Sequence, residues 1–141
     1  MSVFSKTYGE KISEIRSDVV ISSSFAEPGD KGGASCCALW DTGANASAIS
    51  NKVAQKLGLV AIDHASVETA NGKCEVPIYM VDFLLPAGNS VKRIQVMGTN
   101  LNICDALIGM DIITLGDMLI TNAPNTRFEF RLPSKGAPSL K

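Results

Sequence analysis

The segment from Ala38 to Ser50, ALWDTGANASAIS, constrains the fold and the chemistry of this chain more than any other. An apolar run typical of a strand ends at Asp41, and Thr42 and Gly43 follow it directly. The strand would fix the backbone that carries the carboxylate, and the glycine would let backbone amides approach it closely. Hydrogen bonds donated to a carboxylate favour its ionised form, whereas a second carboxylate nearby disfavours it. We therefore single out Asp41, for which a solvated turn aspartate is the ordinary alternative.

The remaining pattern predicts a mostly β domain. Short runs rich in β-branched and aromatic residues are bounded by glycine, proline or asparagine, and pairs of such runs predict hairpins. Residues 1–16 show no clear period and predict a frayed strand or arm. The expected strands are 19–25, 35–40, 67–70, 73–76, 78–85, 91–97, 118–121 and 127–132, with turns at 27–33, 71–72, 86–89, 98–100 and 122–125.

Two short helices interrupt this pattern. The first is expected from Ser50 to Leu57, because Ser50 can cap it and Gly58 stands where a left-handed residue usually ends a helix. The second is expected from Asp111 to Leu115, with Asp111 as its N-cap.

The hairpin around Asn71-Gly72 has an open register. This dipeptide is a strong signal for a two-residue turn. Such a turn would place Glu68 opposite Glu75, and like charges directly opposite each other are unfavourable. Either both side chains face solvent or the true register differs, and the two alternatives stay open at this point.

Charge and hydropathy exclude several classes of function. A formal net charge of −1 provides no basic field for nucleic acid. No apolar run approaches the roughly 20 residues that span a bilayer, and the first 18 residues lack the apolar core of a signal peptide. We therefore expect a soluble, cytoplasmic protein that binds neither nucleic acid nor membrane.

The cysteines and the histidine argue against a disulfide framework and a metal site. Cys36 and Cys37 are adjacent, and with Cys74 and Cys104 they match no disulfide spacing, so reduced thiols are expected. With His64 as the one histidine and no Cys-x-x-Cys, we expect no metal and no cofactor.

A second motif completes a recognisable order of elements. Leu107-Ile108-Gly109 follows the predicted hairpin and precedes the second short helix. With the Asp-Thr-Gly segment and the hairpin between the two motifs, the chain resembles the retropepsin-like aspartic proteases from about Val19 to Arg131. The helix after the Asp-Thr-Gly loop is more similar to that of the cellular and bacterial members than to the retroviral enzymes. The resemblance implies a closed β-barrel, one half of an acid protease, with one or two short helices.

The resemblance also implies roles for individual residues. Asp41 would be the catalytic aspartate, Thr42 would bond across a dimer axis, and Gly43 would allow close backbone approach. Ala44 and Asn45 would lie beside the substrate. A flap would cover bound peptide and exclude water; its substrate-binding residues would be Thr69, Ala70, Asn71, Gly72 and Lys73.

One departure from the retroviral members concerns a charge pair. Those members commonly carry an aspartate and an arginine where this chain has Asn45 and Met110. Both charges are absent together, which avoids an unpaired buried charge and is consistent with an intact fold. The departure weakens any transfer of substrate contacts to Asn45.

The function implied is that of a homodimeric aspartic endopeptidase. Aspartic protease chemistry needs two carboxylates that share a proton, and this chain has a single Asp-Thr-Gly. A second copy would supply the other. The alternatives are a catalytically inactive module for dimerisation or peptide binding, and an unrelated β-barrel with a chance motif. We expect an N-terminal arm over 1–17, the protease domain over 18–132 and a flexible tail over 133–141.

Overall fold

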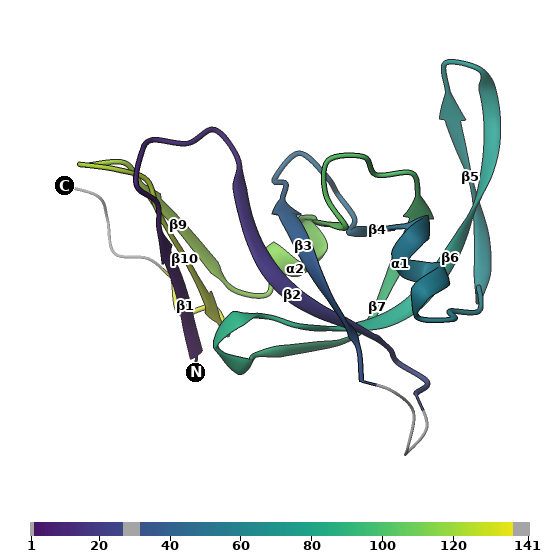
Figure 1. The fold of residues 1–141 in the computed structure, drawn as a ribbon, viewed down its shortest axis with the longest axis horizontal. Coiled ribbons are helices and arrows are strands. Elements are labelled where there is room, and N and C mark those ends of the chain that lie inside the picture. The colour runs from purple at the N-terminus through teal and green to yellow at the C-terminus, as the bar shows by residue number, and fades with distance from the viewer. Residues whose placement is uncertain (1, 27–31, 137–141) are drawn as a thin grey trace.

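The computed structural model describes residues 2–26 and 32–136 (Figure 1). Most of the turn expected at 27–33 and the end of the tail lie outside these residues. The described strands are β1 (Ser2–Thr7), β2 (Ile15–Ser23), β3 (Ala34–Trp40), β4 (Ala48–Ser50), β5 (Asp63–Thr69), β6 (Gly72–Leu84), β7 (Ser90–Thr99), β8 (Ala106–Ile108), β9 (Asp117–Thr121) and β10 (Arg127–Leu132). The helices are α1 (Asn51–Lys56) and α2 (Met110–Ile113), with a short 3-10 turn, η1 (Pro86–Gly88).

Seven strands form one sheet that closes on itself. Their order is β2-β3-β8-β4-β7-β6-β5, and β2 also pairs with β6. In β2, inward residues alternate with more exposed ones, so that Ile15, Val19 and Ile21 enter the core. The expected mostly β, closed barrel with two short helices is therefore confirmed.

A second sheet of three strands packs on one side of the barrel (Figure 1). Its order is β1-β10-β9, with antiparallel pairing throughout. Phe128 and Phe130 of β10 are buried, and their ring centroids lie 5.0 and 4.9 Å from that of Trp40 in the barrel strand β3. The Trp40 indole nitrogen also donates to Ser17 Oγ at 2.8 Å. These contacts join the terminal sheet to the strand that leads to Asp41.

The first helix forms as expected. Ser50 Oγ accepts a hydrogen bond from the Val53 backbone at 3.1 Å, and Val53 and Ala54 are buried against the core. Gly58 has a φ of +63°, the left-handed conformation that the sequence pattern predicts after the helix. Within the described ranges, no helix is long and apolar enough to cross a membrane.

Two local expectations outside the Asn71-Gly72 hairpin are wrong. The turn predicted at 98–100 begins later, because Gly98 and Thr99 belong to β7 and pair in parallel with Ile49 and Ser50. Asp111 is not an N-cap: Gly109 occupies that position, and α2 begins at Met110. The boundaries between the N-terminal arm, the domain and the tail, after residues 17 and 132, stay predictions.

Candidate active site

Asp41 lies where β3 ends and a loop begins. Its backbone nitrogen donates to the Ile108 carbonyl of β8 at 2.8 Å, which ties the start of the loop to the barrel. Its carboxylate Oδ1 accepts a hydrogen bond from the Gly43 backbone at 2.9 Å. Asp41 is half-buried, whereas Thr42 and Gly43 are exposed. The carboxylate is thus held by a backbone amide while its surroundings stay open to a ligand or another chain.

The loop rests on the junction between β8 and α2. β8 pairs with β3 on one side and with β4 on the other, so the chain from Asp41 to Ser47 crosses over it. The Met110 nitrogen donates to the Ala44 carbonyl at 2.8 Å. A side chain at Gly109 would meet the Ala44 carbonyl oxygen at 2.8 Å, so this position needs glycine. The Leu107-Ile108-Gly109 motif therefore supports the loop directly.

Sequence reasoning missed the interaction between Ser47, at the end of this loop, and Asp111 of α2. Ser47 is fully buried, and both its backbone nitrogen and its hydroxyl donate to the carboxylate of Asp111, at 3.0 and 2.7 Å. A serine followed by Ala48 and Ile49 was an available signal, because a buried hydroxyl needs a polar partner. The sequence offered no indication that the partner would be Asp111, which is 64 residues away.

A groove beside Asp41 is built from three distant segments. Its volume is about 370 Å³, and both apolar and polar side chains line it. Met118 and Ile120 of β9 form one side, and Ile120 is 43% exposed. The lining residues are Ser13, Glu14, Ile15, Leu39, Trp40, Asp41, Thr42, Met118 and Ile120. Asp41 and Thr42 therefore share an open surface with the terminal sheet.

A larger cavity of about 810 Å³ lies elsewhere, between α1, the end of β2 and β6. Lys56 is the one charged side chain among the described residues that line it. The smaller groove contains the Asp41 carboxylate, a group able to act as an acid or a base, and the larger cavity has no carboxylate among its described lining residues, so the smaller groove is the better candidate active site despite its size.

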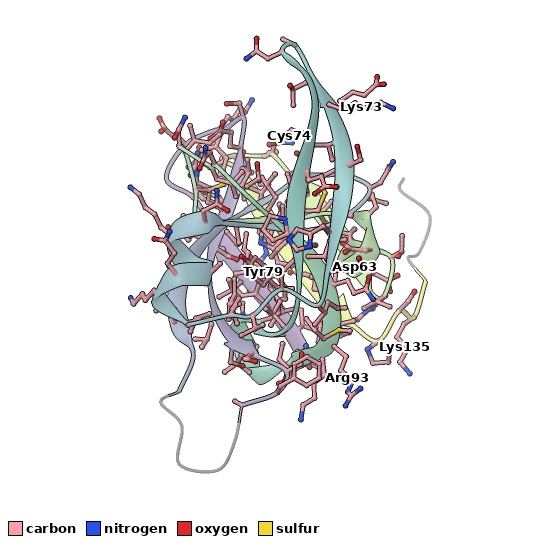
Figure 2. The ribbon with its side chains drawn as sticks, turned by 90° about the vertical axis from the view of Figure 1, so that its right-hand side faces the viewer. Asp63, Lys73, Cys74, Tyr79, Arg93 and Lys135 are labelled. Carbon is pink, nitrogen blue, oxygen red and sulfur yellow. The ribbon has the colours of Figure 1, made fainter. Side chains whose placement is uncertain are left out.

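The expected flap is a long exposed hairpin of β5 and β6 that projects from the barrel (Figure 1). Figure 2 shows Lys73 and Cys74 near its tip. The residues of the predicted flap, Thr69, Ala70, Asn71, Gly72 and Lys73, are all exposed. Thr69 Oγ1 accepts from the Asn71 backbone at 3.2 Å and donates to the Gly72 carbonyl at 2.9 Å, which closes the turn.

The hairpin register differs from a simple Asn-Gly turn. Thr69 pairs with Gly72, so Ala70 and Asn71 form the turn and Gly72 follows it with a φ of +105°. This is the type of hairpin turn whose third residue is a glycine in the left-handed conformation. Glu68 consequently lies opposite Lys73 rather than Glu75. The second alternative left open above is correct, and the like-charge pair is avoided.

The predicted site residues therefore fall into two groups. Asp41, Thr42, Gly43, Ala44 and Asn45 are consecutive in one loop, and the flap residues lie at the end of a separate hairpin. The two groups come from opposite parts of the strand order, β3 near one end and β5 at the other. In Figure 1 the end of β3 and the tip of the hairpin point to the same side of the molecule.

The four cysteines, all within the described residues, are free thiols. Burial raises the pKa of the Cys36 thiol to about 11, and burial also raises the pKa of Cys104. A raised pKa disfavours the reactive thiolate. Across the described ranges, no group of three His, Cys, Asp or Glu side chains could hold a metal ion.

Asp117 holds the chain after β10 against the start of β9. Its carboxylate accepts from the Ser134 hydroxyl, from the Lys135 backbone at 2.6 Å and from the Arg131 guanidinium at 2.6 Å. The Ser134 bond, followed by the Lys135 and Arg131 bonds, lowers the pKa of Asp117 far below its usual range. The ionised Asp117 carboxylate thus holds the segment that follows the terminal sheet in place.

The lowered pKa predicts acid sensitivity. Because the folded pKa lies below the unfolded value of about 4, the stabilisation is complete above about pH 4 and is lost as pH falls towards the folded pKa. We expect Asp117→Asn to lower the free energy of unfolding at pH 7, and the gap from wild type to shrink between pH 4 and pH 2. Urea denaturation across this range measures the gap. A gap that stays constant down to pH 2 would contradict the assignment.

Comparison with known proteins places the chain beside one group of enzymes. A family described as "gag-polyprotein putative aspartyl protease" matches residues 28–114. The chain is similar to the structure of a retropepsin-like aspartic protease from Rickettsia conorii, with 16% identity and a TM-score of 0.64, over 91% of this chain and 90% of that one. It is also similar to EIAV protease complexed with the inhibitor HBY-793, with 17% identity and a TM-score of 0.53, over 77% of this chain and 91% of that one. No protein with a curated description matches the chain. The expected retropepsin-like fold is confirmed.

Proposed function

Since this chain belongs to the family of gag-polyprotein aspartyl proteases, we propose that it is a homodimeric aspartic endopeptidase whose active site pairs Asp41 of two copies. The observation that carries the proposal is the position of Asp41, half-buried at the end of β3 with Oδ1 bound by the Gly43 amide. The exposed Thr42 and Gly43 beside it leave room for an equivalent loop. A single copy provides one such carboxylate, so a two-fold axis through this surface would complete the site.

The pair would act by general acid–base catalysis on a water molecule. The ionised Asp41 carboxylate takes a proton from water as the water oxygen attacks the scissile carbonyl carbon. The protonated partner carboxyl donates to the carbonyl oxygen, which gives a tetrahedral intermediate. Asp41, now protonated, gives its proton to the amide nitrogen as the carbon–nitrogen bond breaks, and the partner carboxylate recovers a proton from a hydroxyl of the intermediate, which leaves the carboxyl product. Because this mechanism needs one carboxylate ionised and the other protonated, a bell-shaped dependence of rate on pH is expected.

Substrate would lie between the loop and the flap. Ala44 is half-buried and Asn45 is exposed, so both can border an extended peptide next to Asp41. The flap residues from Thr69 to Lys73 are exposed at the end of a long hairpin, a geometry suited to closing over bound peptide. The apolar side chains in the groove beside Asp41, among them Ile15, Met118 and Ile120, support a substrate or a partner surface with apolar side chains.

The terminal sheet would contribute to the contact between copies. Met118 and Ile120 line the groove that contains Asp41 and Thr42, and β9 is one of the two edge strands of its sheet, with β1 at the other edge. If the two Asp41 carboxylates approach within hydrogen-bond distance, the neighbouring surface of β9 must lie close to the same axis.

The free thiols of the cysteines fit a reducing compartment such as the cytoplasm.

Digestion of a peptide library at several values between about pH 4 and 7 tests the proposal, because such a pair works in roughly this range. We expect internal cleavage products in mass spectra, with a rate maximum inside the range. The competing hypothesis of an inactive peptide-binding module predicts bound peptides and no new termini. Binding without cleavage at every pH would therefore favour that hypothesis.

A further inference from the structure

A buried serine and a carboxylate lie beneath the loop that carries Asp41. The two oxygens of Asp111 accept hydrogen bonds from the Ser47 backbone and hydroxyl, at 3.0 and 2.7 Å. The Ser47 hydroxyl in turn accepts from the Gly109 backbone at 3.0 Å. We propose that this pair, which we call the loop clamp, positions Asp41 for catalysis, so that Ser47 and Asp111 are positioning residues of the proposed protease.

Burial makes the clamp specific. Ser47 has no exposed surface, so its two donors cannot exchange the carboxylate for water when the carboxylate is removed. Hydrogen bonds to an ionised acceptor are shorter and stronger than those between neutral groups. Both Ser47 donors reach a single carboxylate, which fixes the backbone and the side chain of this residue at once. The end of the loop is therefore held in one conformation.

The clamp acts on Asp41 through the short loop between them. The loop has three anchors on the same β8–α2 junction: Asp41 to Ile108 at its start, Ala44 to Met110 in its middle, and Ser47 to Asp111 at its end. The first two are backbone bonds, which any residue type could make. The third depends on the two side chains. Loss of the third anchor would let the Ala44–Ser47 part move and would loosen the orientation of Asp41.

Two other roles for Asp111 do not fit its contacts. It does not cap α2, because Gly109 precedes the helix and Asp111 lies within it. It is unsuited to be the second catalytic carboxylate, because its Oδ1 accepts from Ser47 and from the Ile112 backbone and its Oδ2 accepts from Ser47. Both oxygens thus bind groups of the chain itself, and Asp111 does not line the groove that contains Asp41.

The consequence for catalysis follows from alignment and rests on the proposed function. Two copies of Asp41 must meet closely enough to share a proton, and a misplacement of about 1 Å can cost about 100-fold in rate. Substrate binding through the flap involves a separate hairpin and should change little, whereas the contacts of Ala44 and Asn45 with substrate move with the loop, so a smaller rise in KM is also expected. Loosening the clamp should therefore lower kcat far more than it raises KM.

The chain offers a matched control for this experiment. Ser50 is also a buried serine, and its hydroxyl accepts from the Val53 backbone at the start of α1 rather than from the clamp. We expect Ser47→Ala to lower kcat about 10- to 100-fold, and Ser50→Ala to lower it less than about 3-fold for a similar loss of folding stability. Asp111→Asn, which preserves volume, should behave like Ser47→Ala. An equal effect on kcat in the Ser47 and Ser50 variants would overturn the proposal.

A second readout does not depend on activity. Amide hydrogen exchange at Asp41, Gly43 and Ala44 reports opening of the loop, because each of these amides donates to a backbone or side-chain oxygen. We expect exchange there to become at least 10-fold faster in Ser47→Ala and Asp111→Asn, and unchanged in Ser50→Ala. If the wild type cleaves no peptide, the proposed function fails while faster loop exchange still supports the clamp. Unchanged loop exchange in both clamp variants overturns the clamp, whether or not the wild type is active.

Discussion

Replacing Asp41 with asparagine is expected to abolish peptide cleavage while leaving the barrel and the dimer intact. Asparagine has nearly the same shape, and its side-chain oxygen can still accept from the Gly43 amide that now contacts Oδ1. It cannot take a proton from water or hold a shared proton. Because both copies change together, the general base and the general acid are lost at once, and we expect a loss of about 10⁴-fold or more.

The measurement is the initial rate of cleavage of a library-derived peptide, with sedimentation run in parallel. Asp18→Asn is a suitable control, because Asp18 is an exposed aspartate on β2. It should retain the wild-type rate. A wild-type rate for the Asp41 variant would remove this carboxylate from the mechanism. An inactive variant that is also monomeric would instead assign Asp41 a role in assembly.

Replacing Ile120 with lysine is expected to separate the two copies and to abolish cleavage with the fold of each copy preserved. Ile120 is 43% exposed in a single copy, so a lysine there can reach water without disturbing the core. It also lines the groove with Asp41 and Thr42, so a partner loop at the axis would cover it. Covering two unpaired ammonium groups should cost about 3 kcal/mol or more. This cost corresponds to a dissociation constant of the dimer that is at least about 100-fold higher.

Leu84 provides the matched control for this charge. It is 42% exposed, close to the value for Ile120, but it lies at the end of β6 and does not line the groove. Leu84→Lys should leave both sedimentation and activity unchanged. Circular dichroism should show the same β signature in both variants. A dimeric, active Ile120 variant would place the contact between copies on another surface.

Local patterns in the sequence were sufficient for much of the fold and for the candidate catalytic loop. The strand before Asp41, the cap at Ser50 and the left-handed Gly58 each depend on residues within a few positions of one another. The glycine of Leu107-Ile108-Gly109 was part of a recognisable motif, although its reason, the close approach of Ala44, came from the structure. Such features follow from backbone sterics and periodicity, which act over short stretches.

Contacts between distant segments could not be predicted in the same way. The turn of the flap lies at Ala70 and Asn71, one residue before the predicted position, because pairing of the whole β5–β6 hairpin decides which residues form the turn. β7 continued through Gly98 and Thr99, because β4 was available as a parallel neighbour. The residues next to Asp111 in the sequence predicted that it caps a helix. Its hydrogen-bond partner in the structure is Ser47, which directly precedes β4 and is distant in the sequence.

The sequence pattern alone therefore determined that this chain is mostly β, with a strand-borne Asp41 followed by Thr42 and Gly43, whereas the closed barrel was implied by the resemblance to the retropepsin-like proteases. Periodicity and turn chemistry encode such features locally. The tertiary structure decided which groups support that aspartate and which surface surrounds it. The Ser47–Asp111 clamp and the groove beside β9 form only when segments far apart in the chain pack together, since hydrogen bonding and burial depend on distance in space rather than along the sequence.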